Sequence, residues 1–248
     1  MRRRLPARRT ERSPDVRPSP FPLPLGSTRP FAIAHRESGT PDFWDVRYAE
    51  TDYLFGTGPN AFVADAAERL PVPSRVVELG AGEARTLVWL AAQHGHRPTA
   101  VDFSAAALDG ARRLARAHGV DLETVAADVR AWTPTGRSWD AAIVTFVQLL
   151  PAERQRLYRL LRAVVRPGGW ILGQWFRPDH LRGNYDRVGP STEDRMVPVE
   201  ELRSAFDADR LDVCESRDVQ LHEGPFLQGR AACAQLAARR GEAGVPAP

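Results

Sequence analysis

The sequence contains no lysine and only two cysteines, and these absences exclude several classes of protein. All 34 basic residues in the 248-residue chain are arginine, which we interpret as compositional bias. Cys214 and Cys233 are too few for a disulfide framework or a structural zinc cage, so we expect ordinary buried or half-buried thiols. The six histidines lack the spacing of metal ligands, and no metal site is expected.

Long apolar runs are also missing. No stretch approaches the roughly 18 apolar residues that a membrane-spanning helix needs. Residues 21–25 are apolar but interrupted by proline, and they are too short for the core of a secretory signal. We therefore expect no membrane contact and a cytoplasmic location. The 43% hydrophobic fraction is typical of a globular domain with a buried core.

Positive charge is concentrated at the N-terminus. Residues 1–36 carry nine arginines against two acids, which leaves 25 arginines (34 − 9) and 29 acids (31 − 2) in the remainder. Residues 1–40 lack apolar periodicity, which predicts a disordered arm, or a mis-assigned start, before a domain over 41–240 and a flexible tail over 241–248. An arginine-rich arm can contact nucleic acid, but a solvated extension is the simpler interpretation, and no nucleic-acid partner is expected.

From residue 41 onward the pattern alternates between helices and strands. A helix is expected around residues 42–48, and Asn60 is suited to cap a second helix that ends near Leu70. The further strands are expected at 75–79, 99–101, 122–126, 139–144, 170–175, 211–220 and 231–238, and the helices at 85–93, 105–117, 151–165 and 199–206. This order predicts an α/β, Rossmann-like fold: a seven-stranded, mostly parallel sheet with helices on both faces and a C-terminal antiparallel hairpin.

A glycine turn, Gly80-Ala81-Gly82, follows the strand at 75–79. Such a turn lets the backbone approach a ligand closely, and dinucleotide-binding proteins share this feature. Here, however, Arg85 occupies the place of their third glycine. Glu78 would repel a pyrophosphate but suits the ammonium and sulfonium groups of S-adenosylmethionine.

Two further acids close the next two strands. Asp102 lies about 20 residues after the glycines, where a carboxylate binds ribose hydroxyls in either S-adenosylmethionine or a nicotinamide cofactor. Asp128 can accept a hydrogen bond from an adenine amino group, and the Val129 N–H can donate to the ring. Because the carboxyl ends of parallel strands meet at one edge, we expect these acids to share a ligand site with Glu78.

These residues resemble a known family. Glu78-Leu79-Gly80-Ala81-Gly82, Val101-Asp102, Ala127-Asp128 and Arg166-Pro167-Gly168-Gly169 are similar to the motif series of class I S-adenosylmethionine-dependent methyltransferases. Phe43-Trp44-Asp45-x-Arg47-Tyr48, Tyr53-x-Phe55-Gly56-x-Gly58-Pro59-Asn60 and His222-Glu223-Gly224 resemble the branch of tellurite-resistance and thiopurine methyltransferases. Ala84, Gln148 and Leu227 depart from its usual residues, the last two on the expected substrate side.

The resemblance implies a set of cofactor-binding residues. They are Tyr53, Phe55, Gly56, Glu78, Gly80, Ala81, Gly82, Arg85, Asp102, Phe103, Asp128, Val129, Thr145 and Phe146. The first three would belong to a lid, and Gly80 and Gly82 would approach the methionine part, with Glu78 ordering its amino group through water. Asp102 and Phe103 would flank the ribose. Thr145 and Phe146 would lie near the sulfonium.

The implied reaction is an in-line displacement that needs alignment and a dry site more than acid catalysis. A hydroxyl or amine acceptor would need a general base to remove its proton. The candidates are His180, Tyr185, Asp186 and His222. The absence of a specificity insert favours a small-molecule nucleophile (a thiol or chalcogen, a hydroxyl or an amine) over a macromolecule. The alternatives are a non-catalytic, partner-binding protein on the same fold and a nicotinamide-dependent oxidoreductase. The acceptor atom and the oligomeric state stay open.

Overall fold

The computed structural model of the chain describes residues 39–134, 136 and 138–242. The arm expected over 1–40 and the tail expected over 241–248 lie outside these residues, except for positions 39–40 and 241–242. In chain order the helices are α1 Pro41–Glu50, α2 Ala61–Ala66, α3 Arg85–His94, α4 Ala105–Ala117, α5 Pro151–Val164, α6 Asp179–Arg182 and α7 Val199–Ala205, with short 3-10 helices at Ala67–Arg69 and Glu193–Arg195. The strands are β1 Arg75–Leu79, β2 Arg97–Asp102, β3 Glu123–Ala126, β4 Trp139–Thr145, β5 Val165–Phe176, β6 Arg210–Glu223 and β7 Leu227–Arg239.

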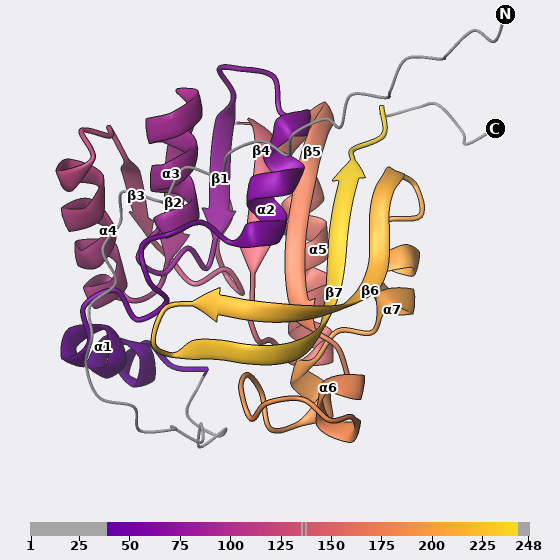
Figure 1. Cartoon of the computed structure of the whole chain (residues 1–248). Coiled ribbons are helices and arrows are strands. Elements are labelled where there is room, and N and C mark those ends of the chain that lie inside the picture. The colour runs from indigo at the N-terminus through magenta and orange to yellow at the C-terminus, as the bar shows by residue number, and fades with distance from the viewer. Residues whose placement is uncertain (1–38, 135, 137, 243–248) are drawn as a thin grey trace, which may run out of the picture.

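The strands form a seven-stranded sheet in the order β3-β2-β1-β4-β5-β7-β6 (Figure 1). Strands β1 to β5 are parallel, and β7 is antiparallel to both β5 and β6. The predicted fold class is confirmed. The strand order reverses at β1, whose neighbours are β2 and β4, and ligands of open α/β sheets bind at such a switch point.

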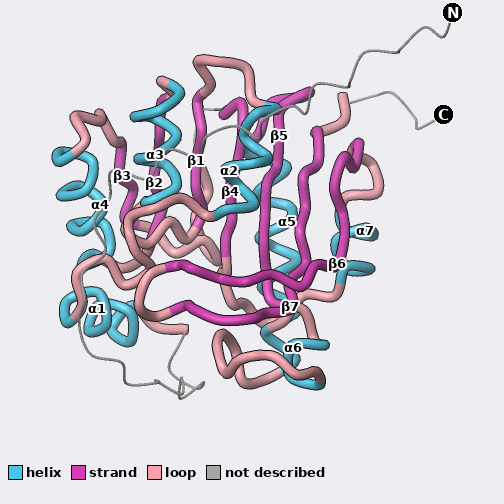
Figure 2. Tube along the Cα trace, in the orientation of Figure 1, coloured by secondary structure: helices cyan, strands magenta, loops and turns pink. Residues whose placement is uncertain are grey.

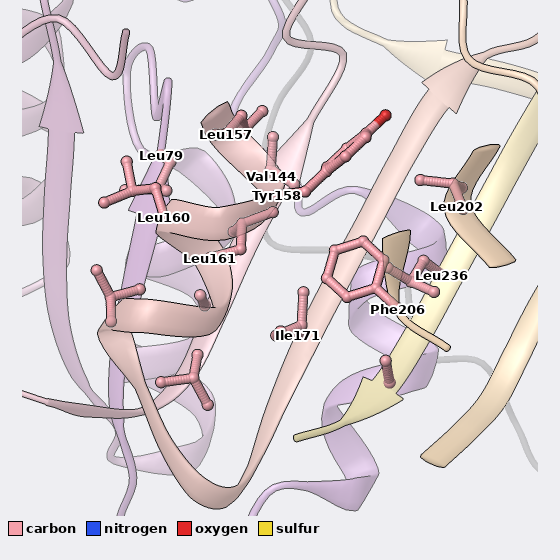
Figure 3. Close-up of a cluster of buried hydrophobic side chains, with 14 of the residues drawn as sticks. Leu79, Val144, Leu157, Tyr158, Leu160, Leu161, Ile171, Leu202, Phe206 and Leu236 are labelled. Carbon is pink, nitrogen blue, oxygen red and sulfur yellow. The ribbon is translucent and has the colours of Figure 1, made fainter. Parts of the chain in front are cut away.

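Helices cover both faces of the sheet because alternate strand residues point to opposite sides. Val77 and Leu79 belong to the core beneath α5 and α7, whereas Val76 belongs to the core beneath α2, α3 and α4. Figure 3 shows the first of these cores, in which side chains of α5 such as Leu161 and Tyr158 meet Phe206, beyond the end of α7. Fully burying one such side chain stabilises the fold by roughly 1.5–3 kcal/mol.

Several helices begin at polar caps that the sequence supplies. The Asn60 side chain accepts a hydrogen bond from the Val63 N–H at 3.0 Å and starts α2, as predicted. Ser104 caps α4 by accepting from the Ala107 N–H at 3.1 Å. Both caps lie at the carboxyl edge of the sheet, so they also fix the loops that face the ligand site.

The C-terminal hairpin is longer than predicted. Strands β6 and β7 pair as far as Glu223 and Leu227, although the Gly-Pro-containing sequence between 221 and 230 resembles a loop. Figures 1 and 2 show the outer half of the hairpin crossing the carboxyl edge of the sheet towards α1. Its tip meets the loop after α1, where the Phe226 N–H donates to the Leu54 carbonyl at 3.2 Å.

Strand β5 also begins earlier than predicted. The strand was predicted to begin at residue 170, and Gly168 before it has a positive φ of 73° that suits a turn. Nevertheless the Gly168 N–H donates to the Arg240 carbonyl at 2.9 Å, and the Arg240 N–H donates to the Gly169 carbonyl at 2.8 Å. Pairing with the chain that follows β7 therefore draws this segment into the sheet.

Candidate functional site

A cavity of about 380 Å³ opens at the carboxyl ends of β1, β2 and β4. Twelve of the fourteen predicted cofactor residues line it: Phe55, Glu78, Gly80, Ala81, Gly82, Arg85, Asp102, Phe103, Asp128, Val129, Thr145 and Phe146. Tyr53 and Gly56 are not part of the lining. The structure thus brings Glu78, Asp102 and Asp128 to one cavity, and their roles toward a ligand stay a prediction.

The glycine turn brings the backbone against this cavity. Gly80 and Gly82 adopt positive φ angles of 71° and 54°, which favour glycine. A methyl group at Gly82 would lie 2.6 Å from the Tyr48 hydroxyl oxygen, so the position also lacks space for a side chain. Ala84 also adopts a positive φ of 55°, and its side chain is fully buried.

Glu78 is the most unusual carboxylate of the site. Its side chain is 2% exposed, and one oxygen accepts a hydrogen bond from the Thr145 hydroxyl at 3.3 Å. The other oxygen, Oε2, is buried and has no hydrogen-bond partner among the described residues. Burial raises the pKa of Glu78 from 4.5 to about 8. A cationic ligand in the cavity would satisfy this oxygen and favour the ionised form.

Asp102 is held rigidly at the end of β2. Its Oδ2 accepts from the Gly82 N–H at 2.8 Å and its Oδ1 accepts from the Ser104 N–H at 2.9 Å. Burial raises the pKa of Asp102, and the two backbone donors oppose that rise. Because each carboxylate oxygen has further acceptor capacity, both remain able to bind the hydroxyls of a ribose.

Asp128 has a partner that the sequence analysis did not anticipate. Arg130 donates to both of its oxygens, from Nε at 2.9 Å and from Nη2 at 2.6 Å. Although partial burial raises the pKa of Asp128, these hydrogen bonds bring it below its usual value. Arg130 also reaches Glu153 at 3.4 Å and the Gly39 carbonyl at 2.8 Å. An adenine at this carboxylate would therefore share it with Arg130.

The loop predicted to belong to a lid, residues 53–58, contacts the hairpin tip, residues 223–226, and we refer to these two segments together as the lid. Glu83 anchors the first segment, because its carboxylate accepts from the Tyr53 N–H at 3.0 Å and from the Leu54 N–H at 2.7 Å. Arg85 ties both segments together. It pairs with Glu223 and donates to the Gly58 carbonyl at 2.6 Å. Arg85 thus has a structural role in the lid as well as a place in the cavity lining.

The candidate bases lie outside the cavity. His180 is buried, and its ring contacts the Val188 carbonyl at 2.7 Å and the Ala232 N–H at 3.3 Å. The Tyr185 hydroxyl donates to Asp218 at 2.7 Å, and Asp186 accepts from the Arg230 N–H. His222 is exposed on the hairpin. The structure therefore gives these four side chains structural or surface positions and brings none of them to the cavity lining.

Other lining residues were not predicted as site residues. Trp44 and Tyr48 were predicted only as part of the N-terminal aromatic signature, but both line the cavity, as Phe55 does. The ring centroids of Trp44 and Tyr48 are 5.9 Å apart. Glu153 and Arg195 also line the cavity, but no spacing in the sequence identifies them as site residues. Gln148 lines it too, and the sequence placed it only on the expected substrate side. The described residues contain no helix long and apolar enough to span a membrane, and no cluster of three or more potential metal ligands.

Comparison with known proteins agrees with this geometry. Residues 76–169 match the family model described as a methyltransferase domain. The chain is 31% identical over 136 residues to the tRNA 5-carboxymethoxyuridine methyltransferase of Escherichia coli strain K12, covering 49% of this chain and 50% of that protein. The chain thus spans about half the length of the curated relatives that it matches.

Solved structures share the fold at low sequence identity. TehB from Haemophilus influenzae has a TM-score of 0.60 and 18% identity, over 81% of this chain and 66% of that one. A protein that converts a disulfide bond into a thioacetal group during echinomycin biosynthesis has a TM-score of 0.64 and 18% identity, over 81% and 92% of the chains. The DhpI complex with S-adenosylhomocysteine has a TM-score of 0.52 and 23% identity, over 82% and 96%.

The match to a tRNA-modifying enzyme corrects one expectation. The sequence analysis excluded a nucleic-acid partner and expected a small-molecule substrate, but a relative with this identity acts on tRNA, so that exclusion is wrong. Residues 76–169 therefore match a methyltransferase domain, and the sheet order gives the chain the fold that these solved structures share.

Proposed function

We propose that this protein transfers the methyl group of S-adenosylmethionine to an acceptor bound in the same cavity. The observation that carries the proposal is the buried Oε2 of Glu78, which lacks a partner among the described residues and lines the cavity next to the glycine turn. An ammonium or sulfonium group favours the ionised form of this buried carboxyl group and compensates its charge, whereas a pyrophosphate, which is itself negative, provides no such compensation. This difference favours the methyl donor over a nicotinamide cofactor.

The residues present fit the donor's other parts as well. Asp102 has two oxygens fixed by backbone donors and able to accept from ribose hydroxyls. Val129 is 8% exposed in the cavity lining and supplies an apolar surface for a flat ring. The bound donor would supply an activated methyl group on a positively charged sulfur. The protein's tasks are to align the acceptor with that methyl group and to exclude water.

The lid performs the second task. Phe55 and Phe226 pack edge to face with ring centroids 5.5 Å apart, so the two segments of the lid meet through apolar surface. Trp44 and Tyr48 extend this surface along the cavity. The four bases predicted from the sequence do not line the cavity, but carboxylates such as Glu83 and Glu153 do. A thiolate acceptor needs no base, whereas a hydroxyl or an amine could use one of these carboxylates.

Two classes of acceptor belong to this proposal. The first is the small-molecule nucleophile expected from the sequence, a thiol or chalcogen, a hydroxyl or an amine. The second is a tRNA nucleotide, which the match to the Escherichia coli tRNA methyltransferase favours. Transfer of a radiolabelled methyl group to a small-molecule panel and, separately, to bulk tRNA distinguishes the two. The cytoplasmic location stays a prediction.

Calorimetry with S-adenosylhomocysteine tests the donor. We expect the wild-type protein to bind this product and Asp102→Asn to weaken its binding by roughly 1–3 kcal/mol, since one charged acceptor is lost. Asp109→Asn is the matched control, because that exposed carboxylate contacts Arg112 on the surface of α4. Absence of binding by the folded wild-type protein refutes the proposal. Saturable binding of a reduced nicotinamide in its place would support the oxidoreductase.

A further inference from the structure

Three arginines line the cavity, and they differ in whether a carboxylate pairs with the guanidinium. Arg85 pairs with Glu223, and Arg130 pairs with Asp128 and Glu153. Arg195 has no carboxylate partner among the described residues. Its Nη1 donates to the Gln148 carbonyl at 3.0 Å, and its other guanidinium N–H donors have no acceptor among the described residues. The cavity therefore holds one half-buried cation available to a ligand.

A buried ion pair fixes the segment that carries Arg195. Arg154, which is 4% exposed, donates to both oxygens of Glu201 at 2.9 and 2.7 Å. The same guanidinium donates to the Leu149 carbonyl at 3.1 Å and to the Asp194 carbonyl. It thereby joins the loop after β4 to the residue immediately before Arg195. On the other side of Arg195, Met196 is fully buried. The Arg195 backbone is thus held in place before any ligand binds.

Gln148 provides a second, independent observation at the same place. Its Oε1 is buried and has no hydrogen-bond partner among the described residues, which costs free energy unless a ligand compensates it. Gln148 follows Thr145 and Phe146, the residues predicted to lie near the sulfonium, by two or three positions in the same loop. Gln148 and Arg195 therefore both line the cavity, next to the loop residues predicted to lie near the sulfonium.

We propose that Arg195 and Gln148 form the acceptor subsite and that the acceptor carries a carboxylate bound by Arg195. The inference rests on the proposed function and names its substrate class. A planar guanidinium binds a carboxylate through two parallel hydrogen bonds. One available cation matches a single negative charge, while five acids in the lining, Glu78, Glu83, Asp102, Asp128 and Glu153, would repel a dianion such as a phosphate monoester.

Binding tests the subsite without turnover. Saturation-transfer NMR on the full-length protein loaded with S-adenosylhomocysteine compares benzoate with benzamide, two probes of similar shape that differ in charge. We expect benzoate to bind and benzamide to bind at least tenfold more weakly, which corresponds to about 1.4 kcal/mol. Arg195→Gln should bring benzoate to the level of benzamide, and Arg195→Lys should restore part of the difference. Arg187→Gln, an exposed site outside the cavity lining, is the control.

Turnover provides the second readout. In a panel in which each thiol, phenol or amine is offered as a carboxylic acid and as its primary amide, we expect the acids to react with the higher kcat/KM. Arg195→Gln should remove this preference through KM, because the charge contacts the acceptor and not the methyl group. Equal binding of benzoate and benzamide, or a preference that survives Arg195→Gln, overturns the inference. In that case S-adenosylhomocysteine still binds, whereas its failure to bind contradicts the proposed function itself.

Discussion

Replacing Glu78 by glutamine should stabilise the unliganded protein and weaken its preference for a cationic ligand. The side chain is 2% exposed, and burial raises its pKa from 4.5 to about 8. The folded chain therefore keeps a proton that the unfolded chain has already released. Consequently the free energy of unfolding decreases as the pH rises from about 4.5 to about 8. A neutral glutamine of similar shape removes this dependence.

The magnitude follows from the difference between the two pKa values. A difference of about 3.5 pH units at about 1.36 kcal/mol per unit corresponds to roughly 5 kcal/mol. Relative to wild type, Glu78→Gln should therefore gain about 3 kcal/mol between pH 4.5 and pH 7, and about 5 kcal/mol by pH 9. All other titrating groups are common to both proteins, so the difference between the two pH profiles isolates Glu78.

Urea denaturation of both proteins at pH 5, 7 and 9 measures this difference. Calorimetry with S-adenosylmethionine provides the functional counterpart. Since a bound cation favours the ionised carboxylate, wild-type affinity should rise with pH up to about 8, by at most tenfold per unit, more steeply than that of Glu78→Gln. The variant also controls for titration of the ligand's own amino group. Parallel stability profiles, with a constant offset between pH 5 and pH 9, would refute the reasoning.

Two further substitutions test the geometry of the site and of its support. Gly82→Ala places a methyl group 2.6 Å from the Tyr48 hydroxyl and should abolish measurable S-adenosylhomocysteine binding in calorimetry. Gly119→Ala, which has a φ of 64° and open space around it, should share the backbone cost of about 1–2 kcal/mol in urea denaturation but bind normally; equal loss of binding in both would contradict the steric explanation. Arg154→Ala leaves buried partners unpaired and should cost about 3–5 kcal/mol of unfolding free energy. Arg166→Ala, which breaks an exposed pair with Asp140, should cost less than about 1 kcal/mol, and similar losses for both would refute the importance of burial.

Local patterns in the sequence were sufficient to predict the elements of the central sheet. The bounds of β1 and α4 match the prediction, because Val76, Val77 and Leu79 are apolar and the glycine turn ends the strand, and because Ser104 caps the helix. The carboxylates of Glu78, Asp102 and Asp128 could be assigned to one site for a related reason. Each one ends or follows a strand of a parallel sheet, and topology alone brings such positions together.

Contacts between distant segments could not be predicted in this way. Nothing near Glu223 in the sequence indicates that it pairs with Arg85, and nothing near Arg195 indicates that it lines the cavity. For the candidate bases, the sequence suggested a catalytic role where the structure gives a structural one. His180 was a candidate because its side chain titrates, yet its ring contacts the Val188 carbonyl and the Ala232 N–H. In both cases the partners depend on how the segments after β5 fold over the sheet edge, which no local periodicity encodes.

The lid has a consequence for the order in which the molecule assembles. Asn60 and Glu223 are 163 residues apart in the chain, and Arg85 and Glu223 are 138 apart, yet their side chains are in contact. Contacts between such distant residues pay a larger loop-closure entropy than the pairing of neighbouring strands. We therefore expect the central strands to form before the lid closes. During synthesis the chain would then form its central sheet before the lid is in place. The lid would be completed only when β6 and β7, the last strands synthesised, have formed.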